Sequence, residues 1–503
     1  MDESDIVSHS DDKTDLIDLS SARADDCPCP AGPPPHREPR PVLLRKGEHP
    51  ISRREIDPDV FKIINRLHGF GFTAYVVGGA VRDMLLGLVP KDFDIVTDAR
   101  PGQIKKRFSN AFLIGRRFRL AHIHFGGGKV IEVATFRKDP GPETEPAPSP
   151  SGEAEEPGGP ERAEPAADHS ADDAGIHLPP GEDREHPDAG PGGRLRRRPP
   201  RHHQDMPDIY GMPYEDAFRR DTTINALFFD VLTSTVIDYV GGLEDIARRK
   251  VRIIGDPSQR FIEDPVRIWR VVRQSARLNF QIDEATELAI PTHCHLLASV
   301  PGARLFEELN KDLKGGAKPV IGALVRFGIL GQILGRPGKE YESDPELFSG
   351  LDKALEALDR AVAEEPGLTL EEMYALLFWP CVKAKICGVR GDVIPILNDM
   401  FAASGIVVTI PRSMRAHIAN ILAALSAMDR ALKTGHMRWS LKRRAHYSQA
   451  SFVFFLLEKG FPPPREEGEP FEILFRQAYP SGGPGRRRRP RRKRPPAKQG
   501  GSL

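Results

Sequence analysis

The sequence predicts an α+β protein: a mixed β-sheet head followed by an all-helical neck and body, with a disordered leader, insertion and tail. Between residues 74 and 136, short runs of β-branched and aromatic residues alternate with helical stretches and glycine turns. From about residue 255 onwards, apolar residues recur almost throughout at helical spacing. The first 60 residues, and the stretch between Phe136 and Tyr210, contain no Phe, Trp or Tyr, so they bury too little apolar surface to fold.

These patterns divide the chain into folded and disordered segments. In order, they are a disordered leader (1–45), the first part of the head (46–138), a disordered insertion (139–207), the second part of the head (208–250), a helical neck (251–315), a helical body (316–475) and a basic disordered tail (476–503). We interpret 139–207 as looped out of one folded unit, because strand-like runs resume at 226–231 and 236–240 and need a sheet to join. The alternative is a linker between two domains.

The head begins with a helix and two strands that flank a glycine turn. Apolar residues at helical spacing predict a helix over 58–69, which glycine ends. A strand over 74–77, the Gly-Gly turn, a helix over 80–87 and a strand over 92–97 follow.

The rest of the first half of the head contains a helix and a hairpin. We expect a helix over 101–108 and strands over 121–125 and 130–136, joined by the glycines at 126–128. Although Lys129 follows these glycines, the GxxxxGK[ST] spacing of a phosphate loop is absent, so we interpret them as a hairpin connection.

Two carboxylates on the predicted strand 92–97 are the most informative pair in the chain. Side chains on a strand alternate between faces, so Asp92 and Asp94 share a face, with Cα atoms roughly 7 Å apart. The turn at Gly78 and Gly79 lets backbone N–H groups approach a phosphate, and the following helix presents its positive end to the anion. This combination suits a site for Mg²⁺ and a triphosphate. The alternative is an edge strand with two solvated acids.

A third acid, Glu132, lies on a neighbouring predicted strand. It is a candidate metal ligand or a general base for an attacking hydroxyl. The alternative is a side chain that faces outwards from the sheet.

The second half of the head contributes a cluster of charged residues at 219–221. Arg219 and Arg220 are suited to triphosphate oxygens or ribose hydroxyls because the guanidinium donates forked hydrogen bonds. Asp221 and Thr222 are also suited to capping a helix, and both uses are compatible.

The segment 261–280 predicts a helix that begins with Asp264 as N-cap and Pro265 in the first turn. Four arginines fall on one face of this helix: Arg267, Arg270, Arg273 and Arg277. They form either a solvated basic face or a nucleotide site, in which Asp264 and Arg267 act as acceptor and donor for the edge of a base. The helical spacing of the arginines does not decide between these two interpretations.

Charge and composition bear on partners and location. The net charge of +1 averages an acidic region at 141–190 with basic runs at 194–203 and 486–498. We expect the basic tail to bind RNA or other polyanions, the alternative being a solubilising end. No apolar run approaches the ~18 residues of a membrane span, and the N-terminus lacks a signal-peptide pattern.

The five cysteines indicate a reducing compartment, so we expect a cytoplasmic protein. Cys27 and Cys29 have no second Cys/His pair near them in the sequence, which argues against a metal role.

Several motifs, taken together and in order, resemble a known family, the class II nucleotidyltransferases that comprise bacterial poly(A) polymerases and CCA-adding tRNA nucleotidyltransferases. The resemblance covers roughly 48–315 and rests on HPISRREID, VVGGAVRD, KDFDI, LIGRRFRLAHIHF, IEVATFR, RRDTTINAL, DYVGGLEDI and FIEDPVRIWRVVR. It implies a head of the nucleotidyltransferase type.

The resemblance also implies roles for individual residues. Asp92 and Asp94 would bind the catalytic Mg²⁺ (or Mn²⁺). The triphosphate, the sugar and the base of an incoming ATP would be bound by Gly78, Gly79, Arg82, Arg220, Asp221, Glu263, Asp264, Arg267 and Arg270.

Within that family, several features favour poly(A) polymerases. The segment 113–125, the HPISRREID opening and the arginine-rich C-terminus are similar to them. Ala80 departs from the glycine of many poly(A) polymerases and is common among CCA-adding enzymes. Thr222 replaces the usual phenylalanine, which predicts looser packing beneath the nucleotide.

The resemblance therefore predicts template-independent addition of AMP from ATP to the 3′ ends of RNA (mRNA, small RNA or tRNA) by a monomer. The alternative is a CCA-adding or A-adding tRNA nucleotidyltransferase. A more distant alternative is a catalytically inactive RNA-binding relative.

Overall fold

The computed structural model describes residues 39–115, 120–138, 210–364, 367–386, 389, 391–463 and 469–480. The predictions for the insertion, for Cys27 and Cys29, and for most of the leader and the tail lie outside these residues.

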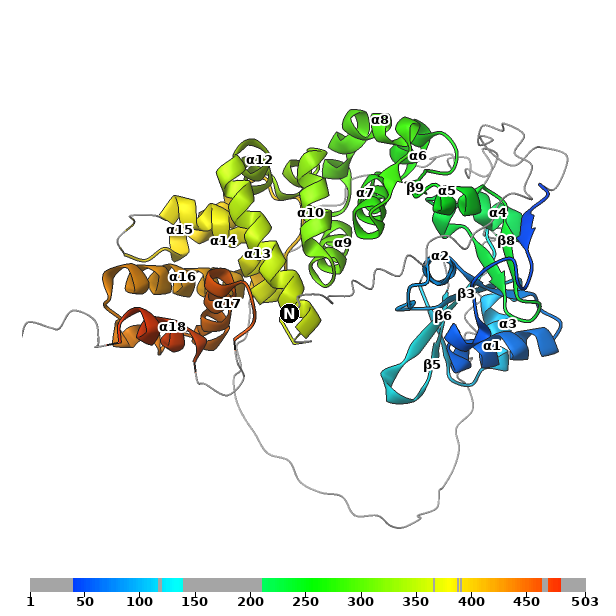
Figure 1. The fold of residues 1–503 in the computed structure, drawn as a ribbon, viewed down its shortest axis with the longest axis horizontal. Helices are drawn as coiled ribbons and strands as arrows, with labels where there is room; N and C mark the ends of the chain where they lie inside the picture. The colour runs from blue at the N-terminus through cyan, green and yellow to red at the C-terminus, as the bar shows by residue number, and fades with distance from the viewer. Residues whose placement is uncertain are drawn as a thin grey trace, which may run out of the picture. The chain divides into compact units, whose positions relative to one another are not determined.

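The head is built on one mixed sheet of eight strands (Figure 1). In spatial order the strands are β1 (Val42–Leu44), β8 (Thr235–Asp238), β7 (Phe228–Asp230), β2 (Ala74–Val77), β3 (Asp94–Thr97), β6 (Val130–Thr135), β5 (Leu120–His124) and β4 (Ala111–Ile114). The pair β3–β6 is parallel and the other pairs are antiparallel. The strands that follow the insertion thus join the same sheet as those before it, and the predicted α+β class is confirmed.

Two strands differ from the sequence predictions. Val42–Leu44 forms β1 and pairs with β8, so these residues do not belong to a disordered leader that ends at 45. Ala111–Ile114 forms the edge strand β4, which was not predicted. Both are very short strands at the two edges of the sheet, where alternation over three or four residues gives little signal.

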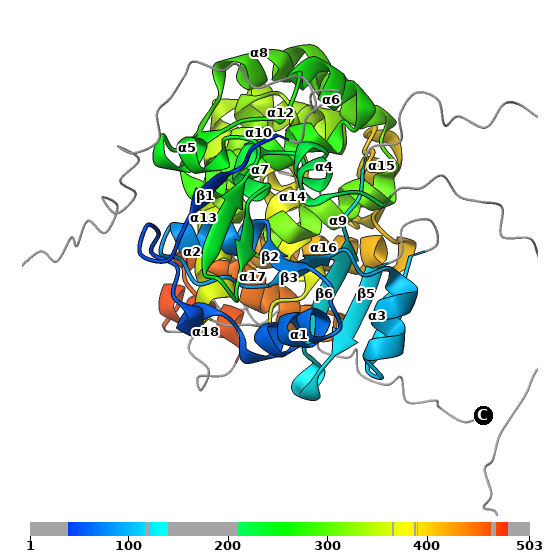
Figure 2. The same cartoon turned by 90° about the vertical axis from the view of Figure 1, so that its right-hand side faces the viewer.

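The helices of the head cover the sheet, and Figure 2 shows α1 and α3 beside its strands. These elements are α1 (Pro58–Gly69), α2 (Gly79–Leu85), α3 (Pro101–Arg107), α4 (Pro213–Phe218) and α5 (Gly242–Ala247), with short 3-10 turns at Arg53–Glu55, Gly126–Gly128 and Thr223–Asn225. Helix α1 has the predicted bounds because Asp57 caps its first turn, Pro58 opens it, and Val60, Ile63, Ile64 and Leu67 bury one face.

The rest of the described chain is helical apart from the two-residue strands β9 (Lys250–Val251) and β10 (Gln281–Ile282). The helices are α6 (Pro257–Glu263), α7 (Val266–Leu278), α8 (Glu284–His293), α9 (Gly302–Leu313), α10 (Ala317–Arg326), α11 (Leu330–Leu334), α12 (Arg336–Ser343), α13 (Pro345–Glu364), α14 (Leu370–Ile386), α15 (Ile394–Ala403), α16 (Arg412–Thr434), α17 (Tyr447–Lys459) and α18 (Pro470–Ala478), with 3-10 turns η5 (Cys294–Ser299) and η6 (Trp439–Leu441). Among these helices, none combines the length and the apolar character needed to cross a membrane.

Candidate active site

The two carboxylates lie at the start of β3. The strand begins at Asp94, two residues later than predicted, so Asp92 belongs to the loop that enters it. Both carboxylates are exposed, whereas Ile95 is fully buried and Phe93 packs partly buried against the core. The pair therefore lies at the exposed first end of β3, a strand inside the sheet between β2 and β6 and not an edge strand, while Phe93 and Ile95 pack towards the core.

The glycine turn lies directly beside this pair. Val77 of β2 pairs with Asp94, and the next residue, Gly78, ends the strand with φ of +78°. A side chain at Gly78 would need a backbone conformation that L-residues rarely adopt. Its Cβ would also lie 3.6 Å from a guanidinium nitrogen of Arg220. Helix α2 starts at Gly79, so its N-terminal N–H groups begin next to the carboxylates.

Glu132 is the nearest acid on a neighbouring strand. It pairs in parallel register with Asp94, and on its other side with His122 of β5. The carboxylate of Glu132 lies 3.4 Å from Nε2 of His122. The sheet thus places Glu132 beside Asp94 on the adjacent strand β6, as expected from its strand.

Negative charge predominates around the carboxylate pair, with Arg220 as a partial counter-charge. The protein packed around Asp94 desolvates its carboxylate, and the charges of Glu132 and Asp92 act in the same direction, which together raise its pKa to about 6. Arg220 opposes this shift. A carboxylate held at elevated energy by neighbouring acids is stabilised by any cation that binds there.

The donor set fits a divalent metal ion bound together with a nucleotide. Within the described ranges, no group of three or more His, Cys, Asp or Glu side chains is placed to hold a metal ion. Mg²⁺ is usually bound by one or two carboxylates while water and substrate phosphates complete its octahedron. Asp92 and Asp94 supply two such carboxylates at the solvent-accessible start of β3.

The raised pKa of Asp94 leads to a stability prediction. Because its folded-state pKa of about 6 exceeds the ordinary value of 3.8, ionised Asp94 destabilises the fold above about pH 6, and this penalty vanishes as the pH falls towards 4. In metal-free protein at pH 7.5, Asp94→Asn is expected to raise the melting temperature by about 1–3 °C after allowing for solvent screening. Differential scanning calorimetry in EDTA measures this change. Adding Mg²⁺ should then raise the melting temperature of the wild type more than that of the variant. A lower melting temperature of the variant in EDTA would contradict the electrostatic account.

Arg82 and Arg220, the predicted triphosphate ligands, are held by acids of the head. Arg82 donates to Asp83 and, at 2.6 Å, to the side-chain oxygen of Asn225. Arg220 donates two hydrogen bonds to one oxygen of Asp216, at 2.9 and 3.1 Å. Both arginines are therefore fixed beside the Gly78 turn before any nucleotide binds.

Asp216 is a site residue that sequence reasoning missed. It is fully buried and binds both Arg219 and Arg220. Burial disfavours its charged form, but the two arginines hold its pKa below the usual value. Asp216 lies on α4, three and four residues before the arginines that follow the end of this helix, and that spacing was the available signal.

Asp221 connects the head to helix α7. Its two carboxylate oxygens accept hydrogen bonds from Nε of Arg267 at 3.0 Å and from Arg270 at 2.8 Å. Burial opposes ionisation of Asp221, but Arg270 and Arg267 lower its pKa. Arg267 also donates to Glu263 at 2.7 Å. Thr222 is the N-cap residue of the 3-10 turn Thr223–Asn225, but no side-chain hydrogen bond caps that turn, so the predicted side-chain capping by Asp221 or Thr222 is wrong.

Asp264 lies between helices α6 and α7. It ends α6, and its Oδ1 accepts the N–H of Val266 at 3.2 Å. The prediction of Asp264 as N-cap is wrong by one residue, because Pro265 is the N-cap and α7 begins at Val266. Its other oxygen accepts a hydrogen bond from Arg304 of α9 at 2.6 Å. Arg304 is 40 positions away in sequence, and nothing in the local pattern indicated this partner.

The arginine face of α7 is not a solvated basic surface. Arg273 is buried and bound to Glu308 and Asp312 of α9, and Asp312 also accepts from the indole of Trp269. Arg277 reaches Asp312 at 3.3 Å. The face is therefore paired with acids of the head and of α9, and that alternative is excluded.

The packing around Thr222 is not loose. It is fully buried, and its hydroxyl lies 2.8 Å from the side-chain oxygen of Gln274 on α7. This polar contact takes the place of the apolar packing expected from a phenylalanine, so the prediction of looser packing is not supported.

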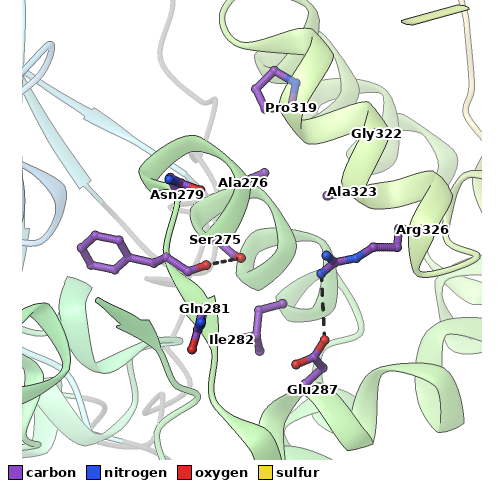
Figure 3. A pocket seen from close by; sticks show the side chains of 11 residues that line it. Ser275, Ala276, Asn279, Gln281, Ile282, Glu287, Pro319, Gly322, Ala323 and Arg326 are labelled. Carbon is purple, nitrogen blue, oxygen red and sulfur yellow. Dashed lines mark hydrogen bonds and ion pairs between the residues drawn. The ribbon is translucent and has the colours of Figure 1, made fainter. Parts of the chain in front are cut away.

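A cavity of about 740 Å³ lies beyond the C-terminal end of α7, between β10, α8 and α10 (Figure 3). Ser275 donates to the carbonyl of Phe280 at 2.6 Å on one wall, and Arg326 approaches Glu287 to 3.9 Å on another. None of the predicted site residues lines this cavity.

Comparison with known families places two domains in the chain. The family described as "Poly A polymerase head domain" matches residues 74–252, and "Probable RNA and SrmB- binding site of polymerase A" matches 279–341. The first match contains the carboxylate pair, the glycine turn and Asp221.

Curated relatives agree with these matches. Poly(A) polymerase I of Salmonella typhimurium is 40% identical over 278 residues, which cover 55% of this chain and 50% of that protein. That of Haemophilus influenzae is 33% identical over 348 residues, covering 68% and 66%. The CCA-adding enzyme of Bacillus pumilus is 32% identical over 253 residues, covering 50% and 49%. The chain thus spans only about half the length of the first of these relatives.

A solved structure described as "The complex structure of CCA-adding enzyme with CTP" shares the fold, with a TM-score of 0.52, 19% identity and coverage of 87% of this chain and 85% of that one. On the sequence matches and the site geometry together, the chain belongs to the family of poly(A) polymerases and CCA-adding enzymes.

Proposed function

We propose that this protein is a template-independent polynucleotide adenylyltransferase that adds AMP from ATP to RNA 3′ ends and releases pyrophosphate. The observation that carries the proposal is the carboxylate pair Asp92 and Asp94 beside the Gly78 turn, with the pKa of Asp94 raised to about 6. Higher identity to poly(A) polymerase I, 40% against 32% for a CCA-adding enzyme, supports the choice of ATP.

In the proposed reaction, the terminal 3′ hydroxyl of RNA attacks the α-phosphorus of ATP in line. A phosphodiester bond forms, the bond to the β-phosphate oxygen breaks, and pyrophosphate leaves. Mg²⁺ or Mn²⁺ held by Asp92, Asp94 and the phosphates would supply Lewis-acid chemistry, which lowers the pKa of the hydroxyl and neutralises charge on the leaving group.

The proposed roles of the other residues follow from their positions. Gly78 and Gly79 leave room for the triphosphate against the backbone, and Arg82 and Arg220 offer it guanidinium donors fixed by acids. Glu132 lies opposite Asp94 in the strand register, which supports a role for it as the general base that would accept the proton of the attacking hydroxyl.

The base would be recognised at the junction of α6 and α7. Asp264 offers acceptors and Arg267 donors for a base edge, while Asp221, Glu263 and Arg270 hold Arg267 and its helix in place. A base read by protein groups needs no template strand, which accounts for addition without one.

The rival function is a CCA-adding or A-adding tRNA nucleotidyltransferase. Ala80, buried in helix α2 next to the site, is the observation that favours it, since alanine at this position is common among CCA-adding relatives. Both functions use the same carboxylates, so nucleotide choice separates them.

We further propose that the enzyme acts as a monomer in the cytoplasm on mRNA, small RNA or tRNA ends. The basic segment 486–498 would strengthen RNA binding without reading its sequence.

Primer extension tests the proposed function. Purified full-length protein, 5′-labelled oligo(A) and ATP with Mg²⁺ should give a ladder of longer products, and EDTA should abolish it. Absence of any extended product at micromolar enzyme would overturn the proposal.

A further inference from the structure

His122 of β5 contacts the proposed general base, Glu132, from the next strand of the sheet. It belongs to the segment 113–125, which resembles poly(A) polymerases and has no part in the proposed reaction. In the strand register His122 pairs with Glu132 of β6, and Glu132 pairs with Asp94 of β3. Figure 2 shows β3, β6 and β5 side by side. Residues directly opposite each other on neighbouring strands share a face, so Asp94, Glu132 and His122 form one row across three strands.

This row lies on the face of the sheet that turns away from the hydrophobic core. The next residues along the two strands, Val133 and Ile123, are fully buried, whereas the residues of the row reach solvent. After desolvation, the charge of Glu132 is the next cause of the raised pKa of Asp94, so the two carboxylates are close. The row therefore connects the proposed metal site to His122.

The carboxylate of Glu132 has little besides His122 to hold it. In the part of the chain that the structure describes, His122 is the only basic side chain within ion-pair distance, with Nε2 at 3.4 Å from one carboxylate oxygen. The side chain of Glu132 is 41% exposed, and that of His122 is 28% exposed. A long, partly exposed glutamate samples several rotamers unless a neighbour restrains it. The ring of His122, on a stem with fewer rotatable bonds, supplies such a restraint.

We propose that His122 is a positioning residue for nucleotidyl transfer: its Nε2 holds one carboxylate oxygen of Glu132 and leaves the other to accept the proton of the attacking 3′ hydroxyl. This inference rests on the proposed function, in which Glu132 is the general base. A general base contributes roughly 10²- to 10⁴-fold to a rate, provided that it stays within hydrogen-bond reach of the proton. Loss of the restraint should cost part of this factor, about tenfold in kcat, and leave substrate affinity unchanged.

Variants at position 122 test whether the ring acts through its nitrogen. With full-length protein, oligo(A), ATP and Mg²⁺, His122→Ala should lower kcat about tenfold while KM for ATP and KM for RNA stay unchanged. His122→Gln should restore most of kcat, because the amide nitrogen of glutamine can take the place of Nε2. Both variants should melt at the wild-type temperature, because the side chain lies outside the core. The control is His124→Ala, on the same face of β5, whose ring packs against Phe112 at 4.9 Å; it should keep full kcat.

A double-mutant cycle tests whether His122 acts through Glu132. Glu132→Gln alone should slow the reaction by more than His122→Ala does. Adding His122→Ala to Glu132→Gln should slow it by only about twofold or less, because no base is left to position. Single-turnover rates with enzyme in excess keep the slow variants measurable. A tenfold loss in both backgrounds would overturn the inference, as would a normal rate of His122→Ala or a His122→Gln variant as slow as His122→Ala.

The choice of substrate separates this inference from the proposed function. A wild type that adds CMP to tRNA but no AMP to oligo(A) would overturn the proposed function alone. The same variants, assayed with CTP and tRNA, would then decide the role of His122, because both reactions use the same carboxylates. An active wild type whose rate is unchanged by Glu132→Gln would overturn the role of Glu132 as base and this inference with it. A wild type that transfers no nucleotide to any RNA would overturn both the proposed function and the role of His122.

Discussion

Replacing Asp94 by asparagine is expected to lower kcat for AMP addition by about three orders of magnitude or more, and Asp92→Asn should do the same. Both carboxylates flank the position where the divalent metals would meet the nucleotide phosphates, so neither compensates for the other. Because both side chains are exposed and neither belongs to the core, the variants should keep the fold, with the melting temperature of Asp94→Asn raised as predicted above.

Steady-state primer extension with ATP and Mg²⁺ measures the loss, and circular dichroism with thermal melting establishes that the variants fold. Asp399→Asn, the same isosteric change at an exposed position on α15, is the matched control and should keep full activity. Full activity of a folded Asp92→Asn or Asp94→Asn protein would exclude these acids from the reaction.

Arg273→Ala is expected to cause the largest loss of stability, about 3–5 kcal/mol. Its guanidinium lies 2.5 Å from Glu308 and also binds Asp312, and both acids are buried. Removing the arginine leaves two buried negative charges without their main partner. Equilibrium urea unfolding at pH 7 measures the loss, with Arg277→Ala as a milder control, because Arg277 is more exposed and touches Asp312 only at 3.3 Å.

The same ion pairs predict a pH dependence. Burial disfavours the ionised form of Glu308, yet Arg273 and Arg270 hold its pKa at about 2. Because this value lies below the ordinary 4.5, Glu308 contributes stability that is fully present above about pH 4.5 and is lost as the pH falls towards 2. Glu308→Gln should therefore lower the free energy of unfolding by about 2–3 kcal/mol at pH 7 and by much less at pH 3. An equal loss at both pH values would show that the ion pairs do not set the stability of this junction.

Local signals in the sequence were sufficient for the elements that carry the carboxylate pair. Strand β2 has its predicted bounds at 74–77, and the Gly78 turn has the positive φ that only glycine adopts freely. Strand β3 starts two residues late because alternation does not reveal where hydrogen bonding to β2 and β6 begins.

Contacts between residues far apart in sequence were not predictable from local patterns. The arginine face of α7 was visible as a periodicity, but its acid partners Glu308 and Asp312 come from α9. Arg304 reaches Asp264 across 40 residues in the same way. Spacing shows which residues share a face, whereas the identity of the opposing element depends on tertiary packing.

The contact of Thr222 shows a further limit of predicting side-chain packing from the sequence. The family resemblance marked Thr222 as a small polar residue in place of the usual phenylalanine, which predicted looser packing beneath the nucleotide. In the structure, the hydroxyl of Thr222 lies within hydrogen-bond distance of Gln274 on α7. The unusual residue at position 222 therefore has a polar partner 52 residues away in the sequence.

Nucleotide choice on two RNAs tests the central claim most directly. Full-length protein is given either an unstructured oligomer or a tRNA lacking its 3′ terminus, with ATP alone or CTP alone. Our account predicts repeated AMP addition to the unstructured oligomer and little CMP addition to either RNA. Efficient CTP incorporation confined to the tRNA would contradict it and identify a CCA-adding enzyme.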